Sequence, residues 1–392
     1  MVQLSKLVQK EESLMRTSVS KIYTAFCILS PILFVYSFYL PYGTWILLAL
    51  FPIFAIVGTK INRESQTQYL TIIIVYLVLQ LFLTIFITNA KPYISIMQTL
   101  FYLLSVYLFH DSLFDIEYGL HVFKKTCYYA TIYLLIQLFF AEVFGINTTA
   151  YIPILKQRQL LVNNYIANNL EIRPHSFFVE PSGYGAYVGM YLCIALLLKA
   201  LTSNKNIKFE VFLTLGIICA RSSTGFFMML LAWGYWFFLT IIKGRVKLIL
   251  RLGVGLVMSL LILGSLGYLD TVFIGFTHAY SSATVRLFGF TNNLTSTDLT
   301  KVLFGYSMVT FESGYLSQWP RVYYMFGITG LIIWGIYLLS MFLYSKNSIQ
   351  RFVVLIVFLT CFFAMALTGT VIPFYYSLMH GMNRLRVNKE GF

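Results

Sequence analysis

The chain is poor in charged residues, and acidic residues are the scarcer kind. Only 11% of its 392 residues are charged, with 14 Asp and Glu against 28 Lys and Arg. Soluble domains carry about 25% charged residues. With 59% hydrophobic residues and so few charges, the chain cannot cover a water-exposed surface. We therefore expect an integral membrane protein, with lipids around it.

Several motifs that carry chemistry are also missing. The five cysteines all lie in apolar runs, and no CxxC or other metal-ligand spacing occurs, which disfavours a disulfide framework and a zinc site. There is no Walker loop and no paired-carboxylate metal motif. No acidic residue falls deep inside an apolar run, where ion coupling often needs one. These absences weigh against a pump, a coupled transporter and a metal-dependent transferase, so we expect neither metal nor cofactor.

The main feature present is a series of apolar runs. A helix needs about 20 mostly apolar residues to cross a bilayer. Two runs are short, and tilting or half-insertion there would lower the count to ten or eleven. We predict an all-α polytopic membrane protein with about 12 transmembrane helices, forming one integral membrane domain over residues 1–392. The predicted spans are residues 22–40, 44–58, 69–88, 93–109, 126–142, 182–199, 209–220, 224–242, 248–268, 322–344, 352–369 and 370–382.

The basic residues predict the orientation. They flank apolar runs instead of alternating with aromatic residues, so they orient the chain and give no sign of nucleic-acid binding. With the amino terminus inside and the spans alternating, 20 of the 28 basic residues fall on the inner side. We predict both termini in the cytoplasm. Residues 1–21 are polar and form either a short amphipathic surface helix, which we favour, or a disordered segment, and the apolar run after them would act as an uncleaved anchor.

Two external loops stand out by length, at residues 143–181 and 269–321. Usual connections have about 4–6 residues, and long loops tend to carry function. Five of the eight basic residues on the outer side are arginines. The planar guanidinium binds phosphate or carboxylate through two hydrogen bonds. We therefore expect the external arginines to converge on one anionic ligand.

The first candidate segment contains Arg173 and Glu180, just before a predicted span. Pro174 and Pro181 prevent one continuous helix across it, and Pro181 suits a helix start. The following glycines, 183, 185 and 189, allow close helix approach. The alternative is an interfacial Arg–Glu pair that only anchors the loop.

Arg221 is the second candidate, because it separates two apolar runs with almost no loop. Ser222, Ser223 and Thr224 can cap the next helix. A helix amino terminus with an arginine beside it is a natural anion site. The alternative is an arginine that snorkels to the membrane surface.

The second long loop contains His278, Arg286, Glu312 and Arg321. A carboxylate or imidazole near cationic groups could act as a general base. For His278 the alternative is a solvated loop histidine. The aromatic residues of this loop fit either sugar stacking or an interfacial aromatic belt.

These segments together resemble a known enzyme group. With two long external loops among about twelve spans, the chain is similar to the Wzy-type bacterial polysaccharide polymerases, which are related to the O-antigen ligases. Many of those ligases have a His-Asn pair where this chain has Glu312-Ser313, which favours a polymerase and leaves the base open. The matching segments are Arg173-Pro-His-Ser-Phe-Phe-Val-Glu180-Pro-Ser182, Arg221-Ser-Ser-Thr-Gly225, Phe304-Gly305-Tyr306, Glu312-Ser-Gly-Tyr-Leu316 and Gly327-Ile-Thr-Gly330.

The resemblance implies a helical bundle similar to the GT-C glycosyltransferases, in a bacterial cytoplasmic membrane with its active site on the outer face. The donor would be a glycan on undecaprenyl pyrophosphate, and the acceptor a sugar hydroxyl of another lipid-linked repeat. The polymer would be lipopolysaccharide or capsule, made without metal or nucleotide, and the family suggests a chain-length regulator as partner. The expected pyrophosphate-binding residues are Arg173, Arg221, Arg286 and Arg321, and the candidate bases are Glu180, Glu312 and His278.

Three other functions stay open. An O-antigen ligase would use the same donor with a different acceptor. A flippase for lipid-linked glycans would have arginines inside its spans and short loops, so the long loops disfavour it. A structural protein of an assembly system would use the loops for docking.

Overall fold

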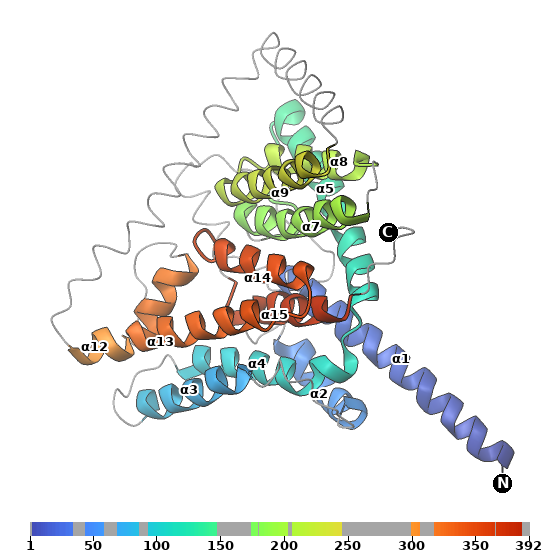
Figure 1. Cartoon of the computed structure of the whole chain (residues 1–392), viewed down its shortest axis with the longest axis vertical. Helices are drawn as coiled ribbons and strands as arrows, with labels where there is room; N and C mark the ends of the chain where they lie inside the picture. The colour runs from blue at the N-terminus through green and yellow to red at the C-terminus, as the bar shows by residue number, and fades with distance from the viewer. Residues whose placement is uncertain are drawn as a thin grey trace. The chain divides into compact units, whose positions relative to one another are not determined.

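The computed structural model describes residues 2–33, 44–58, 69–85, 93–146, 174–178, 180–202, 206–244, 299–305, 317–364 and 366–385. Within these ranges the chain forms twelve α-helices and no strand (Figure 1). The all-α prediction is confirmed for this part of the chain. Eleven of the twelve predicted spans overlap a helix, and the twelfth, residues 248–268, lies outside the described residues.

In the part of the chain that the structure describes, four helices are long and apolar enough to cross a membrane: Ile116–Phe144, Pro181–Thr202, Ser223–Ile242 and Gln318–Leu343. Three shorter apolar helices, Ile46–Gly58, Leu70–Leu83 and Ser348–Thr360, have 10–17 residues each. At about 1.5 Å per residue, such helices are shorter than the ~30 Å hydrocarbon core. A multi-pass membrane protein is therefore plausible, and within the described residues four helices reach this length and apolar character.

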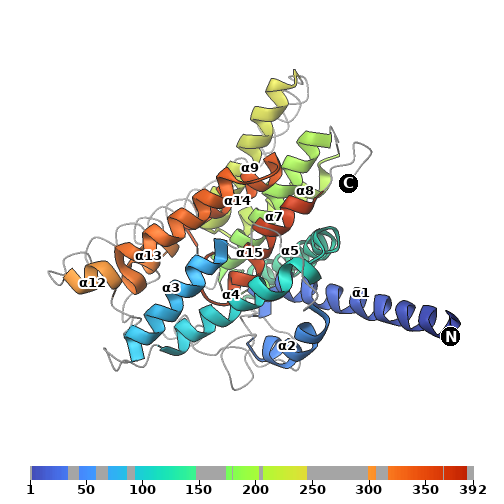
Figure 2. The same ribbon diagram turned by 60° about the horizontal axis from the view of Figure 1, so that its bottom comes forward.

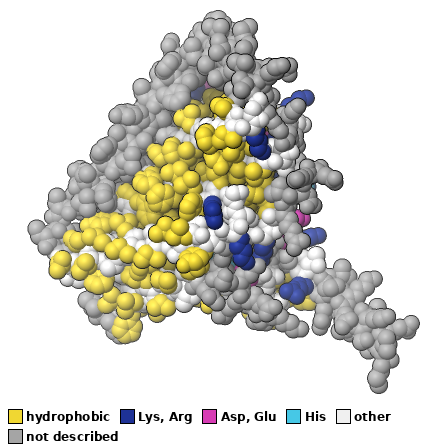
Figure 3. All heavy atoms as spheres, in the orientation of Figure 1, with side chains coloured by type: hydrophobic (Ala, Val, Ile, Leu, Met, Phe, Trp, Pro, Cys, Tyr) yellow, Lys and Arg dark blue, Asp and Glu magenta, His cyan; other side chains and the backbone are white. Residues whose placement is uncertain are grey.

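The surface agrees with contact to lipid. Exposed large apolar side chains follow one face of Gln318–Leu343 at helical spacing, at Ile328, Ile332, Ile336, Leu339 and Leu343. Exposing such a stripe to water costs free energy, whereas contact with hydrocarbon does not. Hydrophobic side chains make up most of the coloured surface in the view of Figure 3.

The helices group into two compact units, and α5 contributes to both. The prediction of a single membrane domain stays a prediction. Unit 1 contains α1 (Val2–Leu33), α2 (Thr44–Gly58), α3 (Leu70–Leu83), α4 (Tyr93–Leu113), α5 (Ile116–Phe144) as far as Lys125, α12 (Leu299–Phe304), α13 (Gln318–Leu343), α14 (Ser348–Thr360) and α15 (Ile372–Gly381). Unit 2 contains α5 from Thr126, α7 (Pro181–Thr202), α8 (Lys208–Cys219) and α9 (Ser223–Ile242).

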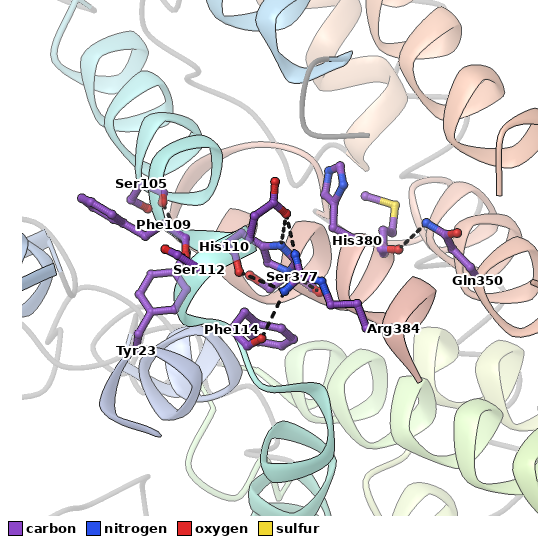
Figure 4. Close-up of polar contacts among 12 residues, drawn as sticks. Tyr23, Ser105, Phe109, His110, Ser112, Phe114, Gln350, Ser377, His380 and Arg384 are labelled. Atoms are coloured by element: carbon purple, nitrogen blue, oxygen red, sulfur yellow. Dashed lines mark hydrogen bonds and ion pairs between the residues drawn. The ribbon is translucent and has the colours of Figure 1, made fainter. Parts of the chain in front are cut away.

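In unit 1, α4 packs against α15, as Figures 1 and 2 both show. A buried ion pair holds one end of this packing. Arg384 Nη2 lies 2.6 Å from Asp111 Oδ1, and the Asp111 side chain is only 6% exposed. The ring of His110 bonds through Nε2 to the Ser377 carbonyl at 3.2 Å (Figure 4). These contacts tie the chain beyond α15 to the end of α4.

Other connections of unit 1 meet at this same end. Ser20 Oγ donates to the carbonyl of Leu113 at 2.7 Å, next to the start of α5. Asn347 Nδ2, between α13 and α14, donates to the Met382 carbonyl at 2.9 Å. The start of the first predicted span, the α4–α5 connection, the α13–α14 connection and the chain after α15 therefore lie together.

Two boundaries in unit 1 differ from the prediction. The predicted span at 352–369 is a shorter helix, α14, because the chain turns after Thr360. Gln318 stabilises that turn, since its Oε1 accepts the backbone N–H groups of Ala366 and Leu367 at 3.1 and 3.2 Å. The second predicted loop contains a short helix, α12, and α13 starts at Gln318, before that predicted loop ends.

A break interrupts α13 at Gly327, which has φ +66° and ψ −163°, a conformation essentially reserved for glycine. Gly327 meets α12 through backbone: a Cβ there would lie 2.3 Å from the Leu303 oxygen. Gly305, with φ +82°, packs equally closely on Met325. The glycines of two segments that carry the family resemblance therefore meet at one joint.

Side chains from α3 and α13 satisfy the backbone at this joint. The Phe326 carbonyl accepts from the hydroxyls of Tyr76 at 2.8 Å and Thr329 at 3.1 Å. Gln80 Nε2 in turn donates to the Tyr76 hydroxyl at 2.8 Å. A helix break in an apolar setting is tolerated where neighbouring side chains bond the freed groups.

Candidate functional site

The site is built on the packing of α7 against α9 in unit 2. A Cβ on Gly185 would lie 2.6 Å from the Cα of Gly225, and a Cβ on Gly189 would lie 2.4 Å from the Met228 Cβ. The contact moves from Gly185 to Gly189 along α7 as it moves from Gly225 to Met228 along α9. The two helices therefore run parallel, and their amino termini lie at the same end. The expected close approach at Gly185 and Gly189 is confirmed. It places the polar segments before Pro181 and before Ser223 at one end of the unit.

Arg221 stands directly before the amino terminus of α9. Its backbone has φ +49°, and its N–H bonds to the Ile218 carbonyl, so it ends α8 in the left-handed position that glycine usually occupies. A non-glycine residue there costs roughly 1–2 kcal/mol. Ser222 follows as the cap of α9, because its Oγ accepts from the Gly225 N–H at 3.4 Å. The predicted helix cap is confirmed.

Glu180 has the corresponding place before α7. Its carbonyl accepts from the N–H groups of Gly183 and Tyr184, and its Oε2 accepts from Ser182 Oγ at 2.8 Å. The helix begins at Pro181, where the sequence predicts it. Glu180 and Ser182 are half-buried.

The last turns of α5 hold both polar segments. Glu142 Oε1 lies 3.6 Å from Arg221 Nη2, with the two side chains 62% and 24% exposed. Gln137, one turn earlier and buried, contacts the other segment: its Oε1 accepts from the N–H groups of Ser176 at 2.7 Å and His175 at 3.3 Å. One helix therefore connects to both segments, and sequence reasoning gave neither side chain a role there.

The 174–178 segment forms a compact turn against α5. Ser176 has φ +57° and donates through Oγ to the Ala130 carbonyl at 2.6 Å. Phe177 stacks on Tyr133 with ring centroids 4.6 Å apart. Burial lowers the pKa of the His175 imidazole. The neutral ring then bonds through Nδ1 to the Phe178 carbonyl at 2.6 Å, with the ring N–H as donor.

The opposite end of unit 2 has its own ion pair. Glu210 Oε2 lies 2.5 Å from Lys199 Nζ, and the Glu210 side chain is almost fully buried. Lys243 donates to the Ala200 carbonyl. These lysines therefore lie together, at the carboxyl-terminal ends of α7 and α9.

The expected site residues fall into three groups. Glu180 and Arg221 lie at the same end of unit 2. Arg321 belongs to unit 1, in the first turn of α13, half-buried, with its N–H bonded to the Ser317 carbonyl. The remaining ones, Arg173, His278, Arg286 and Glu312, lie outside the described residues.

Comparisons with known proteins add nothing to this geometry. No family model, curated protein or solved structure matches the chain. Among the described residues, no group of three or more His, Cys, Asp or Glu could hold a metal ion.

Proposed function

We propose that this protein is a Wzy-type polysaccharide polymerase. It joins oligosaccharide repeats carried on undecaprenyl pyrophosphate, at the outer face of a bacterial cytoplasmic membrane. Donor and acceptor are both lipid-linked glycans. The proposal rests on the segments that resemble this family and on the geometry around Arg221.

The observation that carries the proposal is the backbone of Arg221. A glycine would fit its left-handed conformation with less strain. An arginine there, in front of the α9 amino terminus and at the same end as the α7 amino terminus, indicates that the guanidinium has a role which offsets the strain. Helix amino termini with an adjacent arginine favour an anion.

The reaction needs such a group. The acceptor hydroxyl oxygen forms a bond to the anomeric carbon, and the bond from that carbon to the pyrophosphate oxygen breaks. The leaving pyrophosphate takes the electron pair, so negative charge develops on it, and a guanidinium fixed in advance stabilises that charge. The hydroxyl proton passes to a carboxylate, for which Glu180 is the described candidate. In the proposed site Arg221 binds the pyrophosphate and Glu180 accepts the proton.

Contacts within each unit support the proposed orientation. In unit 1 the segments predicted as cytoplasmic meet around Asp111, Leu113 and Met382. In unit 2 Lys199 and Lys243, also predicted as cytoplasmic, lie together at the end of α7 away from Glu180. The proposed outer segments around Arg221 lie at the other end, as a two-sided arrangement requires.

The test uses Arg221→Gly and Arg221→Lys in a strain lacking the native gene. Arg221→Gly relaxes the backbone, so normal protein level and a melting temperature at or above the native value are expected. Polymer should nevertheless be lost, leaving single repeats on glycan gels. Arg221→Lys should also be impaired, because lysine lacks the two-pronged guanidinium.

The gels separate the proposed function from its rivals. A polymer ladder reduced to single attached repeats supports a polymerase. Loss of all attached glycan identifies a ligase, and a lipid-linked repeat trapped on the cytoplasmic side identifies a flippase. Full polymer length with Arg221→Gly contradicts the role of Arg221.

A further inference from the structure

Gln137 carries a buried amide in an apolar helix. The proposed reaction gives this side chain no role. It lies in α5, within the predicted span 126–142, and is 2% exposed. A polar side chain at such a position is costly unless it is hydrogen-bonded. Its hydrogen bonds reach 38 and 39 residues along the chain, to the backbone of the turn before Glu180.

Both polar atoms of the Gln137 amide form hydrogen bonds with the backbone of the turn. Oε1 accepts the N–H groups of His175 and Ser176, and Nε2 donates to the Ser176 carbonyl at 3.4 Å. The turn needs such support because Ser176 has a left-handed backbone, φ +57°. An apolar side chain at 137 would leave these backbone groups buried without that partner.

One residue separates the turn from Glu180. Phe178 is fixed by two contacts with His175, through its N–H at 3.2 Å and its carbonyl at 2.6 Å. Two residues later Glu180 is held by its carbonyl to the first turn of α7. Because only one residue lies between Phe178 and Glu180, we expect a rotation of the turn at Ser176 to change the direction in which the Glu180 carboxylate faces.

We propose that Gln137 is a positioning residue that fixes the 175–178 turn and thereby aims the Glu180 carboxylate. This rests on the proposed function, in which Glu180 accepts the proton of the acceptor hydroxyl. Gln137 itself contacts backbone and no reacting atom. Glu142 of the same helix lies 3.6 Å from Arg221, so α5 contacts both the turn before the proposed base and the residue proposed to bind pyrophosphate.

The first measurement does not depend on enzyme activity. A Glu180→Cys variant is labelled with a membrane-impermeant maleimide in membranes, with the protein lacking that change as background. Adding Gln137→Met should change the labelling rate at residue 180 by at least about threefold. Gln137→Glu keeps the oxygen that accepts both N–H groups and should restore the rate to within about twofold.

Thr131→Val is the matched control. Thr131 lies on the same helix and is buried, and its hydroxyl bonds the Tyr184 hydroxyl at 2.8 Å, so among the described residues its hydrogen bonds do not include the 174–178 turn. It should lower stability without altering labelling at residue 180. An equal change from Thr131→Val and Gln137→Met would show a general loosening and overturn the proposal.

The second measurement is the polymer ratio on glycan gels, in a mutant cycle with Glu180→Ala. Gln137→Met alone should lower the ratio of polymer to single repeat by about tenfold, which corresponds to about 1.4 kcal/mol. In the Glu180→Ala background it should add less than about twofold, because its effect passes through Glu180. Full additivity would overturn the positioning role.

The two failures are distinguishable. Altered labelling with unchanged polymer keeps the link between Gln137 and residue 180 and removes Glu180 from the proposed reaction. Unchanged labelling at residue 180 contradicts the positioning role of Gln137 and does not affect the proposed function. If Gln137→Met does not reach the membrane, Ser176→Ala, which removes the turn's bond to Ala130, tests the turn itself, and unchanged labelling at residue 180 would then overturn the proposal.

Discussion

His175 shows how a single side chain completes the backbone of a turn. Its imidazole is buried and donates through Nδ1 to the Phe178 carbonyl, and burial disfavours the charged ring. Burial lowers its pKa below the usual 6.5. Between the lowered pKa and 6.5 the unfolded chain binds a proton and the folded one does not. The stability that the neutral His175 ring contributes to the folded protein is present above pH 6.5 and is lost as the pH falls below 6.5.

We therefore predict that His175→Asn, whose amide can also donate to the Phe178 carbonyl, reduces the loss of stability in acid. The melting temperature of purified protein in detergent, followed from pH 7.5 to pH 5.5, checks this. The native protein should lose more than the variant. Parallel curves would contradict a buried neutral His175.

Single residues divide sharply into those that the sequence could predict and those it could not. The Ser222 cap follows from local pattern, because its partner is three residues away. Gln137 gives no local sign, since its partners lie 38 and 39 residues away and its neighbours are apolar. The left-handed backbone of Arg221 also has no signal, because that position usually holds glycine.

The glycines of α7 determine how closely whole helices approach. Gly185→Val would place its Cβ 2.6 Å from the Gly225 backbone, which cannot move as a flexible side chain would. We predict a loss of at least about 1–3 kcal/mol of stability, the range for overpacking. Heating followed by fluorescence-detected size exclusion measures it. The matched control is Gly234→Ala on α9, where a Cβ meets nothing within 4 Å.

The joint of α13 gives a second prediction at this scale. Gly327→Ala would strain a glycine-only conformation and clash with the Leu303 oxygen, so we expect a loss of about 1–3 kcal/mol or more. Gly335→Ala on the same helix has open space and should be neutral or stabilising, since alanine favours helix by about 1 kcal/mol. Equal melting temperatures for the two variants would argue against a strained joint.

At the level of elements, apolar periodicity predicted where helices exist better than where they end. The starts of α7 and α9 agree because proline and serine mark them. The predicted end of the span that contains α14 was wrong because the sequence after Thr360 stays apolar. Gln318, from another part of the chain, bonds the backbone at Ala366 and Leu367 beyond the end of this helix.

For the whole molecule, the pair of Asp111 and Arg384 matters most because it joins distant segments of unit 1. Arg384→Ala would leave the buried Asp111 carboxylate without this partner. We predict a loss of roughly 2–3 kcal/mol, below the range for a fully buried pair because the arginine is 24% exposed. Asp111→Asn combined with Arg384→Gln should recover part of it, measured by melting in detergent. A double variant no better than Arg384→Ala would contradict this.

The orientation itself can be measured on the complete molecule. A cysteine replacing Asn206 should react with an impermeant reagent only in inverted vesicles, and one replacing Gly145 only in intact cells. Composition and the distribution of basic residues were sufficient to predict a multi-pass helical protein. They could not predict two compact units, because that grouping depends on contacts between distant segments.

The joint in α13 also has a consequence for biogenesis. The Phe326 carbonyl depends on Tyr76, which lies 250 residues earlier. At about 5–20 residues per second, the ribosome delivers α3 to the bilayer roughly 12–50 s before α13 emerges. The Tyr76 hydroxyl is therefore in place before the interrupted helix α13 enters the bilayer. A circularly permuted gene that translates α13 first would expose that oxygen to hydrocarbon, and its product should be degraded during synthesis.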